Sequence, residues 1–230
     1  MASLDTGTAI AHLQRADATM ARIIEMVGPF AMAPDPPGEF RSLARAIIFQ
    51  QISGAAAGAI YGRFLALFPE LEAVEEHGPR RTHPAWDGAH QPFPEPGAVL
   101  ARTADELRSA GLSRQKTASL RDLALHFAEG RLSTHLLGDW DDEAVISHLC
   151  QVRGIGRWTA EMFLIFHMQR PNVLPVNDVG INRAIMRQYG LTGMPGADEV
   201  RRIGEPWRPW ATVACWYLWR SEAVVLLTDD

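Results

Sequence analysis

The chain has 230 residues, 47% of them hydrophobic, with a formal net charge of −5 and an isoelectric point near 5.9. This length allows a full hydrophobic core and fits one domain or two small interlocked ones. The negative net charge argues against a protein whose whole surface attracts nucleic acid, so binding to nucleic acid would require a local basic patch. Cys150 and Cys215 are too few for a disulfide framework, a four-thiolate zinc site or an iron–sulfur cluster.

Targeting signals are not evident in the sequence. The N-terminus carries no basic segment followed by an apolar run, so it does not look like a signal peptide. The longest uncharged stretch, Ala46 to Gly62, contains Gln50 and Gln51, which favours a buried helix over a membrane span. We therefore expect a reduced, cytosolic protein that has no membrane partner.

Helical spacing of apolar residues dominates the first half of the chain. It predicts a helix from Thr8 to Met26, stopped by Gly28 and Pro29. Phe40 to Phe68 carries a longer pattern, which predicts two helices or one long buried helix. Residues 69–97 are rich in proline, glycine, histidine and charge, and are predicted to form an inserted surface loop.

The second half is also predicted to be helical. A short helix at Asp105 to Leu107 is followed by Ser113, the predicted N-cap of a helix from Arg114 to about Phe127. Further helices are predicted after Asp141 to Glu143, from Val179 to Tyr189, from about Ala197 to Ile203, and from Pro209. The helix after Asp141 is predicted to turn four residues inward: Val145, Ile146, Leu149 and Cys150. No alternating strand pattern of useful length appears, so the predicted fold class is all-α.

The stretch VRGIGRW, residues 152–158, has the pattern of a tight hairpin between helices. Gly154 and Gly156 allow backbone conformations closed to other residues, and Arg157 opens a helix whose free N–H groups point toward the turn. A DNA phosphate could bind there without any base being read. From Val145 to Gly190, arginines outnumber carboxylates, so the local charge is positive. An isolated G-x-G is more often an ordinary turn, however, and carries little weight alone.

Asp178 follows Pro175 at the start of a helical pattern, which predicts an N-cap. Taken alone, a structural cap is the favoured interpretation. The two roles are compatible, because a carboxylate facing helix N–H groups stays ionised and is held rigidly. A positively charged sugar transition state needs such a group.

Aromatic residues are a third feature of the sequence with a possible binding role. Trp158 and Met162 lie one turn apart on the helix after the hairpin. Five more aromatic residues crowd the C-terminal segment, namely Trp207, Trp210, Trp216, Tyr217 and Trp219. Most of them are expected in the core, although an electron-rich face can also stack on an extruded, cationic base.

Taken together, these motifs resemble the helix-hairpin-helix DNA glycosylase superfamily, and within it the 3-methyladenine DNA glycosylase II, or alkylation-repair, group. The motifs are IIFQQIS (47–53), GLSRQKTASLRDLA (111–124), VRGIGRWTAEM (152–162), LPVNDVG (174–180) and WRPWATVACWYLW (207–219). The resemblance implies two helical subdomains with the active-site cleft between them. We expect one subdomain from residues 1–35 and 190–230, and the other from 36–189, including the helix-hairpin-helix at 141–168.

The resemblance also implies roles for individual residues. The expected set is Asp178 as the catalytic carboxylate; Trp158, Met162 and Trp219 in the base pocket; Gln51 probing the gap left by the flipped nucleotide; Gly154, Gly156 and Arg157 on the DNA backbone; and the backbone carbonyls of Cys150, Val152 and Ile155 around a structural Na⁺ or K⁺. No other cofactor is expected.

Several residues depart from the patterns of relatives. Bifunctional relatives place a Schiff-base lysine where Trp158 stands, and Lys116 is the only lysine in the chain. Met162 stands where some relatives have tyrosine, which leaves the base preference open. Gln51 in place of a bulky apolar wedge suggests a weaker intercalator.

These residues predict a monomeric, monofunctional enzyme that hydrolyses the N-glycosidic bond of alkylated purines such as 3-methyladenine in duplex DNA, the first step of base excision repair. One alternative is a non-catalytic helix-hairpin-helix DNA-binding protein. Another is a glycosylase for oxidised, deaminated or mismatched bases, with lyase activity. His77, His83 and His90 could bind a metal, but a solvated loop is the favoured interpretation of their spacing.

Overall fold

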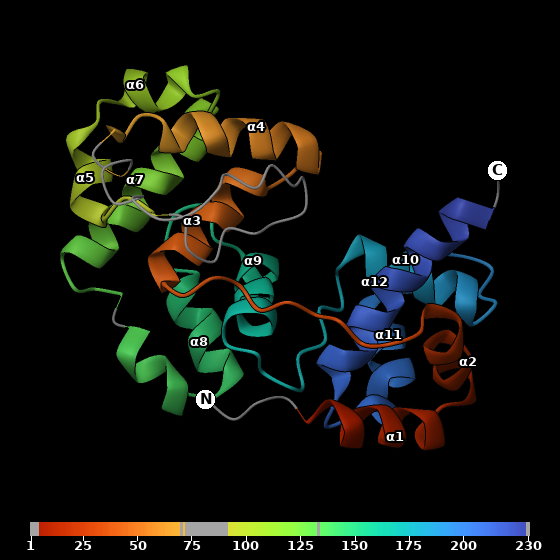
Figure 1. Ribbon diagram of the computed structural model, residues 1–230. Coiled ribbons are helices and arrows are strands. Elements are labelled where there is room, and N and C mark those ends of the chain that lie inside the picture. The colour runs from red at the N-terminus through yellow and green to blue at the C-terminus, as the bar shows by residue number, and fades with distance from the viewer. Residues whose placement is uncertain (1–4, 70, 72–91, 133, 229–230) are drawn as a thin grey trace, which may run out of the picture. The chain divides into compact units, whose positions relative to one another are not determined.

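The computed structural model describes residues 5–69, 71, 92–132 and 134–228. These residues form twelve α-helices, three short 3-10 or π-helical segments and no strand (Figure 1). The predicted all-α class is therefore confirmed. In the described part of the chain, no helix combines the length and the apolar character needed to cross a membrane.

The chain divides into two compact units. The terminal unit comprises the residues up to 34 and those from 164 onward, and the middle unit comprises residues 35–163. This boundary differs from the expected one at residue 190. The reason is that α10 (Val179–Gln188) packs along α12 (Ala211–Thr228), and therefore groups with the C-terminal helix.

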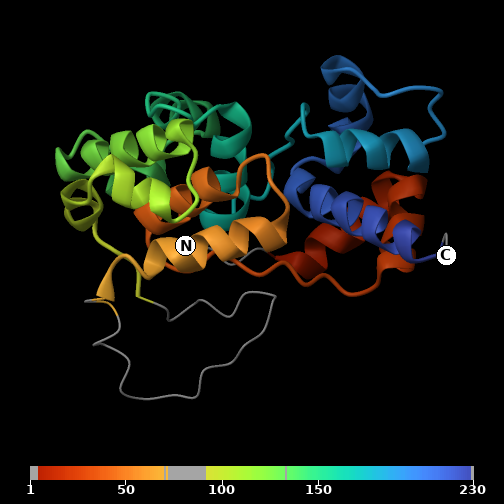
Figure 2. The same cartoon turned by 90° about the horizontal axis from the view of Figure 1, so that it is seen from above.

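The terminal unit joins helices from the two ends of the chain, and Figure 2 shows the blue α12 beside the red N-terminal helices. Its other elements are α1 (Thr6–Ala16), α2 (Ala18–Val27), η3 (Phe163–His167, in which the chain enters the unit), α11 (Ala197–Gly204) and η4 (Glu205–Trp207). Trp207 and Tyr217 are among its largest fully buried side chains. The expected single helix from Thr8 to Met26 is two helices, because Asp17 adopts an extended conformation between them.

Asp17 is a half-buried polar centre of the terminal unit. Its Oδ1 accepts the N–H groups of Thr19 and Met20, and its Oδ2 accepts the Tyr189 hydroxyl at 2.6 Å and the Trp207 indole N–H at 2.9 Å. Burial alone would raise the pKa of Asp17, but the hydrogen bonds outweigh burial and the pKa is lowered. One carboxylate thus joins α2 to the end of α10 and to η4.

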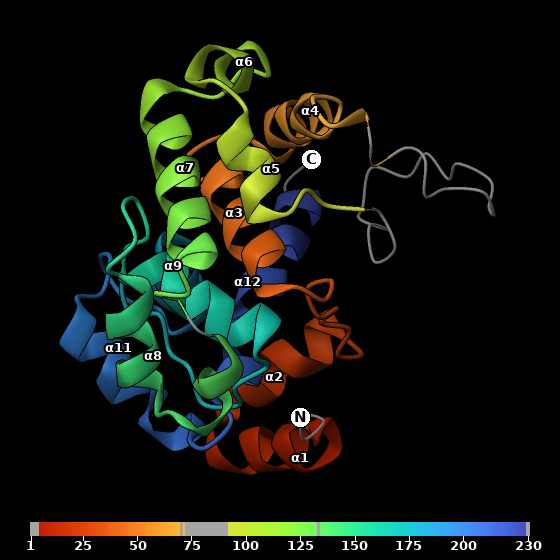
Figure 3. The same ribbon diagram turned by 90° about the vertical axis from the view of Figure 1, so that its left-hand side faces the viewer.

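The middle unit is arranged around its longest helix, α7 (Arg114–Ala128), which packs on α3 and α5 (Figure 3). Its other elements are α3 (Glu39–Phe49), α4 (Gly54–Leu65), α5 (Pro96–Ala101), α6 (Ala104–Ser109), η2 (Thr134–Asp139), α8 (Asp142–Leu149) and α9 (Arg157–Met162). The pattern from Phe40 to Phe68 therefore forms two helices. Ser113 caps α7 as predicted, because its side chain accepts the N–H of Lys116.

The expected loop at 69–97 is only partly described. Residues 72–91, with His77, His83 and His90, lie outside the described residues. Pro96 and Gly97 do not belong to a loop, because they form the first turn of α5. Proline fits this position, where its missing N–H has no helical partner to lose.

Cys150 corrects the expected inward face of α8. Val145, Ile146 and Leu149 are buried, whereas Cys150 is exposed. Cys150 is the C-cap of α8, where the chain leaves the helix and enters the hairpin. The helical periodicity that predicts burial therefore no longer applies at this residue.

Candidate functional site

The hairpin between α8 and α9 depends on one glycine. Gly154 has φ = +80°, and a Cβ there would lie 2.2 Å from Oγ of Ser119 on α7. Both the backbone conformation and the close approach to α7 therefore require glycine. Gly156 does not share these constraints: its φ is −95°, and a Cβ there would meet nothing within 4 Å. The expectation that both glycines adopt conformations closed to other residues is wrong for Gly156.

The N-terminus of α9 lacks a side-chain cap. Its N-cap is the exposed Gly156, which has no side chain to accept the N–H groups of the first turn. The first N–H groups of a helix have no partner within the helix, and they carry the positive end of its dipole. An anion such as a phosphate can take the place of the cap.

Arg157, the first residue of α9, forms ion pairs with two glutamates of the middle unit. Both Nη atoms donate to Glu143, and Nε donates to Glu161 at 3.1 Å. The hydrogen bonds to Glu143 are the main reason that the pKa of Arg157 is raised. Glu143 lies just before the sequence window in which arginines outnumber carboxylates. The hairpin is consequently less positive than that window suggested.

Gln50 joins the hairpin to the α3–α4 loop. Its side-chain nitrogen donates to the carbonyl of Gly154 and to the hydroxyl of Thr159, each at 3.0 Å. The next residue, Gln51, is exposed and has φ = +57°, a conformation that non-glycine residues seldom adopt. Sequence reasoning singled out Gln51 and missed Gln50, which attaches the loop carrying Gln51 to the hairpin.

Asp178 begins α10 as its N-cap, as predicted. It is 7% exposed, and its Oδ1 accepts the N–H of Ile181 at 2.8 Å and the indole N–H of Trp219 at 2.9 Å. Two donors from different elements converge on one oxygen atom. The orientation of the carboxylate is thereby set by both α10 and α12.

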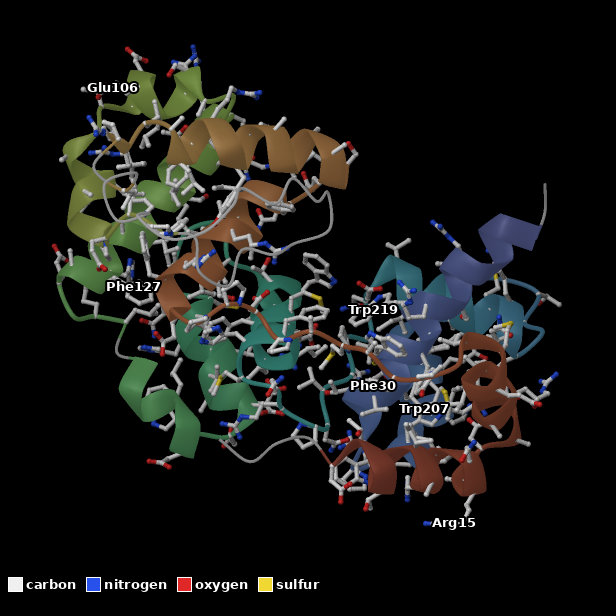
Figure 4. All side chains as sticks on the ribbon, in the orientation of Figure 1. Arg15, Phe30, Glu106, Phe127, Trp207 and Trp219 are labelled. Carbon is white, nitrogen blue, oxygen red and sulfur yellow. The ribbon has the colours of Figure 1, made fainter. Side chains whose placement is uncertain are left out.

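Trp219, labelled in Figure 4, is held on two sides. Its ring stacks on Phe166 with centroids 5.8 Å apart and planes 25° apart. A Cβ at Gly180 would lie 3.1 Å from both the Asp178 Oδ1 and the Trp219 Cδ1, so glycine admits the indole to the first turn of α10. Phe166 and Gly180 are supporting residues that sequence reasoning did not identify.

The remaining predicted pocket residues belong to the middle unit. Trp158 and Met162 both lie on α9; Trp158 is 44% exposed and Met162 is half-buried. Asp178 and Trp219 meet within the terminal unit. The structure therefore brings Asp178 and Trp219 into direct contact. Trp158 and Met162 lie instead on the helix that follows the hairpin.

Lys116 has a structural partner. Its Nζ donates to the carbonyl of Ile48 in the last turn of α3 at 2.8 Å, and burial lowers its pKa. A lysine that caps a helix carbonyl holds its amine in place, so Lys116 has a structural role at the end of α3.

Comparisons with known proteins give consistent results. The family model described as HhH-GPD superfamily base excision DNA repair protein matches residues 44–209. DNA-3-methyladenine glycosylase 1 of Schizosaccharomyces pombe is 29% identical over 215 residues, which cover 91% of this chain and 85% of that protein.

Two solved structures are similar throughout. A 3-methyladenine DNA glycosylase of Schizosaccharomyces pombe, in complex with abasic DNA, superposes with a TM-score of 0.76 at 28% identity and covers 92% of this chain and 95% of that chain. A DNA-3-methyladenine glycosidase of Bacillus halodurans has a TM-score of 0.76 at 32% identity and covers 96% and 91%. The chain belongs to the HhH-GPD superfamily of base excision DNA repair proteins.

Proposed function

We propose that this chain is a monofunctional DNA glycosylase that hydrolyses the N-glycosidic bond of alkylated, cationic purines such as 3-methyladenine. The observation that carries the proposal is the buried Asp178, whose Oδ1 is held by the N–H groups of Ile181 and Trp219. Relatives named for this activity, similar over nine-tenths of the chain, support it.

The proposed chemistry needs few groups. An alkylated purine already carries a positive charge, so it leaves as a neutral base when the bond between C1′ and its nitrogen breaks. Asp178 would stabilise the cationic sugar and accept a proton from the water that attacks C1′. Trp219, Trp158 and Met162 would stack on the extruded base, and electron-rich aromatic faces attract a cationic base most strongly.

Duplex DNA with a damaged base would be the partner, bound by one copy of the chain in the bacterial cytosol. The uncapped N-terminus of α9 would bind a backbone phosphate through the N–H groups beyond Gly156, with Arg157 beside it. Gln51, exposed on the loop that Gln50 attaches to the hairpin, would enter the gap left by the base.

We propose no cofactor other than a structural Na⁺ or K⁺ at the carbonyls of Cys150, Val152 and Ile155. Carbonyl oxygens are suitable ligands for hard cations. The Val152 carbonyl accepts the N–H of Ile155 at 3.1 Å, and an oxygen with two lone pairs can still bind an ion. This ion would stiffen the hairpin and would take no part in bond cleavage.

The decisive experiment replaces Asp178 with asparagine. Asparagine is an equally good N-cap and retains an oxygen acceptor, so Asp178→Asn should fold normally and bind DNA. Base release should fall by about 10²-fold or more, because the negative charge is lost. The assay is single-turnover release from duplexes carrying 3-methyladenine, 7-methylguanine, hypoxanthine or an etheno-adduct.

Asp198→Asn is the matched control, because Asp198 is an exposed carboxylate of α11 in the same unit. Equal base release by Asp178→Asn and the wild type would contradict the proposal. A wild type that binds DNA but releases no base would favour the non-catalytic alternative. Borohydride trapping on abasic DNA would reveal a lyase, and no trapping is expected.

A further inference from the structure

A basic hollow lies beside the hairpin, on the face of the middle unit formed by α6 and α7. It encloses about 590 Å³. Its α7 side includes a helical stripe, Arg114, Ala118, Arg121 and Leu125, with Thr117 and Asp122 beside it. Arg108 of α6 and Arg153 of the hairpin complete the basic lining, and Asp122 is its only carboxylate among the described residues. Figure 3 shows α6 beside one end of α7.

The hollow is built onto the hairpin. The backbone N–H of Arg153 donates to the Asp122 carboxylate at 2.8 Å. One turn earlier on α7, Ser119 contacts Gly154, which admits no Cβ. These contacts fix Arg153 against α7, so the basic side chains start directly beside the turn of the hairpin.

The charge of the hollow is only partly neutralised. Arg121 donates to the carbonyls of Leu100 and Arg102, which are uncharged partners. Arg108 pairs with Asp105 on the surface, where an ion pair contributes little. Arg114 and Arg153 are exposed and form no ion pair with the described residues. Arg157, in contrast, is held by two glutamates.

We propose that this hollow binds the sugar-phosphate backbone of duplex DNA beyond the phosphate at the hairpin. Arginine presents a planar, bidentate donor set to phosphate oxygens. Leu100 and Leu125 give the lining apolar surface, which suits the deoxyribose between phosphates. The inference rests on the proposed DNA partner, but it assigns the salt-sensitive part of the affinity to residues outside the hairpin glycines and the catalytic carboxylate.

The test is the salt dependence of binding to an undamaged duplex, measured by fluorescence anisotropy over a series of NaCl concentrations. The test variant is Arg114→Gln with Arg153→Gln, which removes two exposed charges. The control is Arg15→Gln with Arg202→Gln, which removes two charges from the terminal unit; Figure 4 shows Arg15 extending away from α1.

Each lost phosphate contact lowers the slope of log Kobs against log [salt] by about 0.9. The test variant should therefore have a slope shallower by up to about 1.8, and weaker binding at low salt, while the control keeps the wild-type slope. Equal slopes for the test variant and the wild type would overturn the inference. The same holds if the wild type does not bind duplex DNA.

A second measurement separates DNA from free phosphate. Inorganic phosphate, titrated at constant ionic strength, should not saturate the hollow at the concentrations at which DNA binds. Phosphate binding that is lost in the test variant without a change in the DNA slope would overturn the inference in favour of a small-anion site. Neither measurement uses base release, so a failure of the proposed glycosylase activity remains distinguishable.

Discussion

The first turns of α9 and α10 present the same backbone groups and use them in opposite ways. The N-cap of α10 is Asp178, whose own carboxylate accepts an N–H of the helix. The N-cap of α9 is Gly156, which has no side chain to accept the N–H groups there. One helix end is thus closed by a negative charge that the chain supplies, and the other is open to an anion from outside. The N-cap residue thus decides whether the chain itself supplies a carboxylate, as at α10, or leaves the helix end for the proposed phosphate, as at α9.

Placing a carboxylate at the N-terminus of α9 should give the largest effect, a loss of affinity for DNA. In Gly156→Asp, the backbone angles already suit an N-cap, so the new carboxylate should accept the N–H groups of α9 and repel a phosphate. Juxtaposed like charges cost several kcal/mol, so affinity for duplex DNA should fall by at least about 10²-fold.

Gly156→Ala is the control for this variant, since a Cβ there meets nothing within 4 Å. It should retain the thermal stability of the wild type and most of its affinity. Binding by Gly156→Asp at the wild-type level would show that the open end of α9 does not hold DNA.

A smaller effect, on the rate of base release, is expected from removing one hydrogen bond to Asp178 at the N-terminus of α10. Trp219→Phe removes the N–H that holds the Asp178 Oδ1 and keeps an aromatic ring on Phe166. A hydrogen bond to a charged group contributes about 1.5–3 kcal/mol, so the rate of base release in single turnover should fall by about 10-fold or more.

Trp216→Phe provides the comparison, because Trp216 packs on Phe30 and Tyr217 instead of on Asp178. This change should lower the melting temperature but leave base release near the wild-type rate. If the two variants lost activity equally, the Trp219 hydrogen bond would have no specific role.

The smallest effect concerns Asp17, a half-buried cap whose two carboxylate oxygens both accept hydrogen bonds and which has no expected role in chemistry. Its folded pKa is lowered, so the folded state releases this proton more readily than the unfolded state. The stability that Asp17 contributes is present above the unfolded pKa of about 3.9 and is lost as the pH falls through the folded pKa.

Asp17→Asn should therefore make the free energy of unfolding less dependent on pH below about 4, as measured by urea denaturation. Base release at neutral pH should persist. An unchanged acid slope would mean that other carboxylates dominate acid unfolding.

The sequence predicted the local features of the fold well. Helices with clear caps, such as α7 behind Ser113 and α10 behind Asp178, begin at the predicted residues because capping is decided by neighbours in the chain. The break at Asp17 was missed, because the apolar spacing continues across it and the partners of its carboxylate, Tyr189 and Trp207, lie far away in the chain.

At the candidate site, too, the sequence predicted local motifs but not contacts between distant segments. Asp178 and the hairpin could be recognised from short motifs. The partners that position them come from distant segments: Trp219 and Phe166 for Asp178, Gln50 and Ser119 for the hairpin. The charge of the hairpin was overestimated, because the pairing of Arg157 with Glu143 depends on how α8 and α9 pack.

The two hydrogen bonds of Gln50 also bear on how the middle unit opens. They connect the loop that follows α3 with the hairpin turn and the first turns of α9, so neither segment can separate from the other without losing both bonds. Segments joined in this way tend to unfold locally as one cooperative unit, and their amide protons exchange with a common opening free energy. We therefore expect the loop that carries Gln51 to open together with the hairpin instead of by itself.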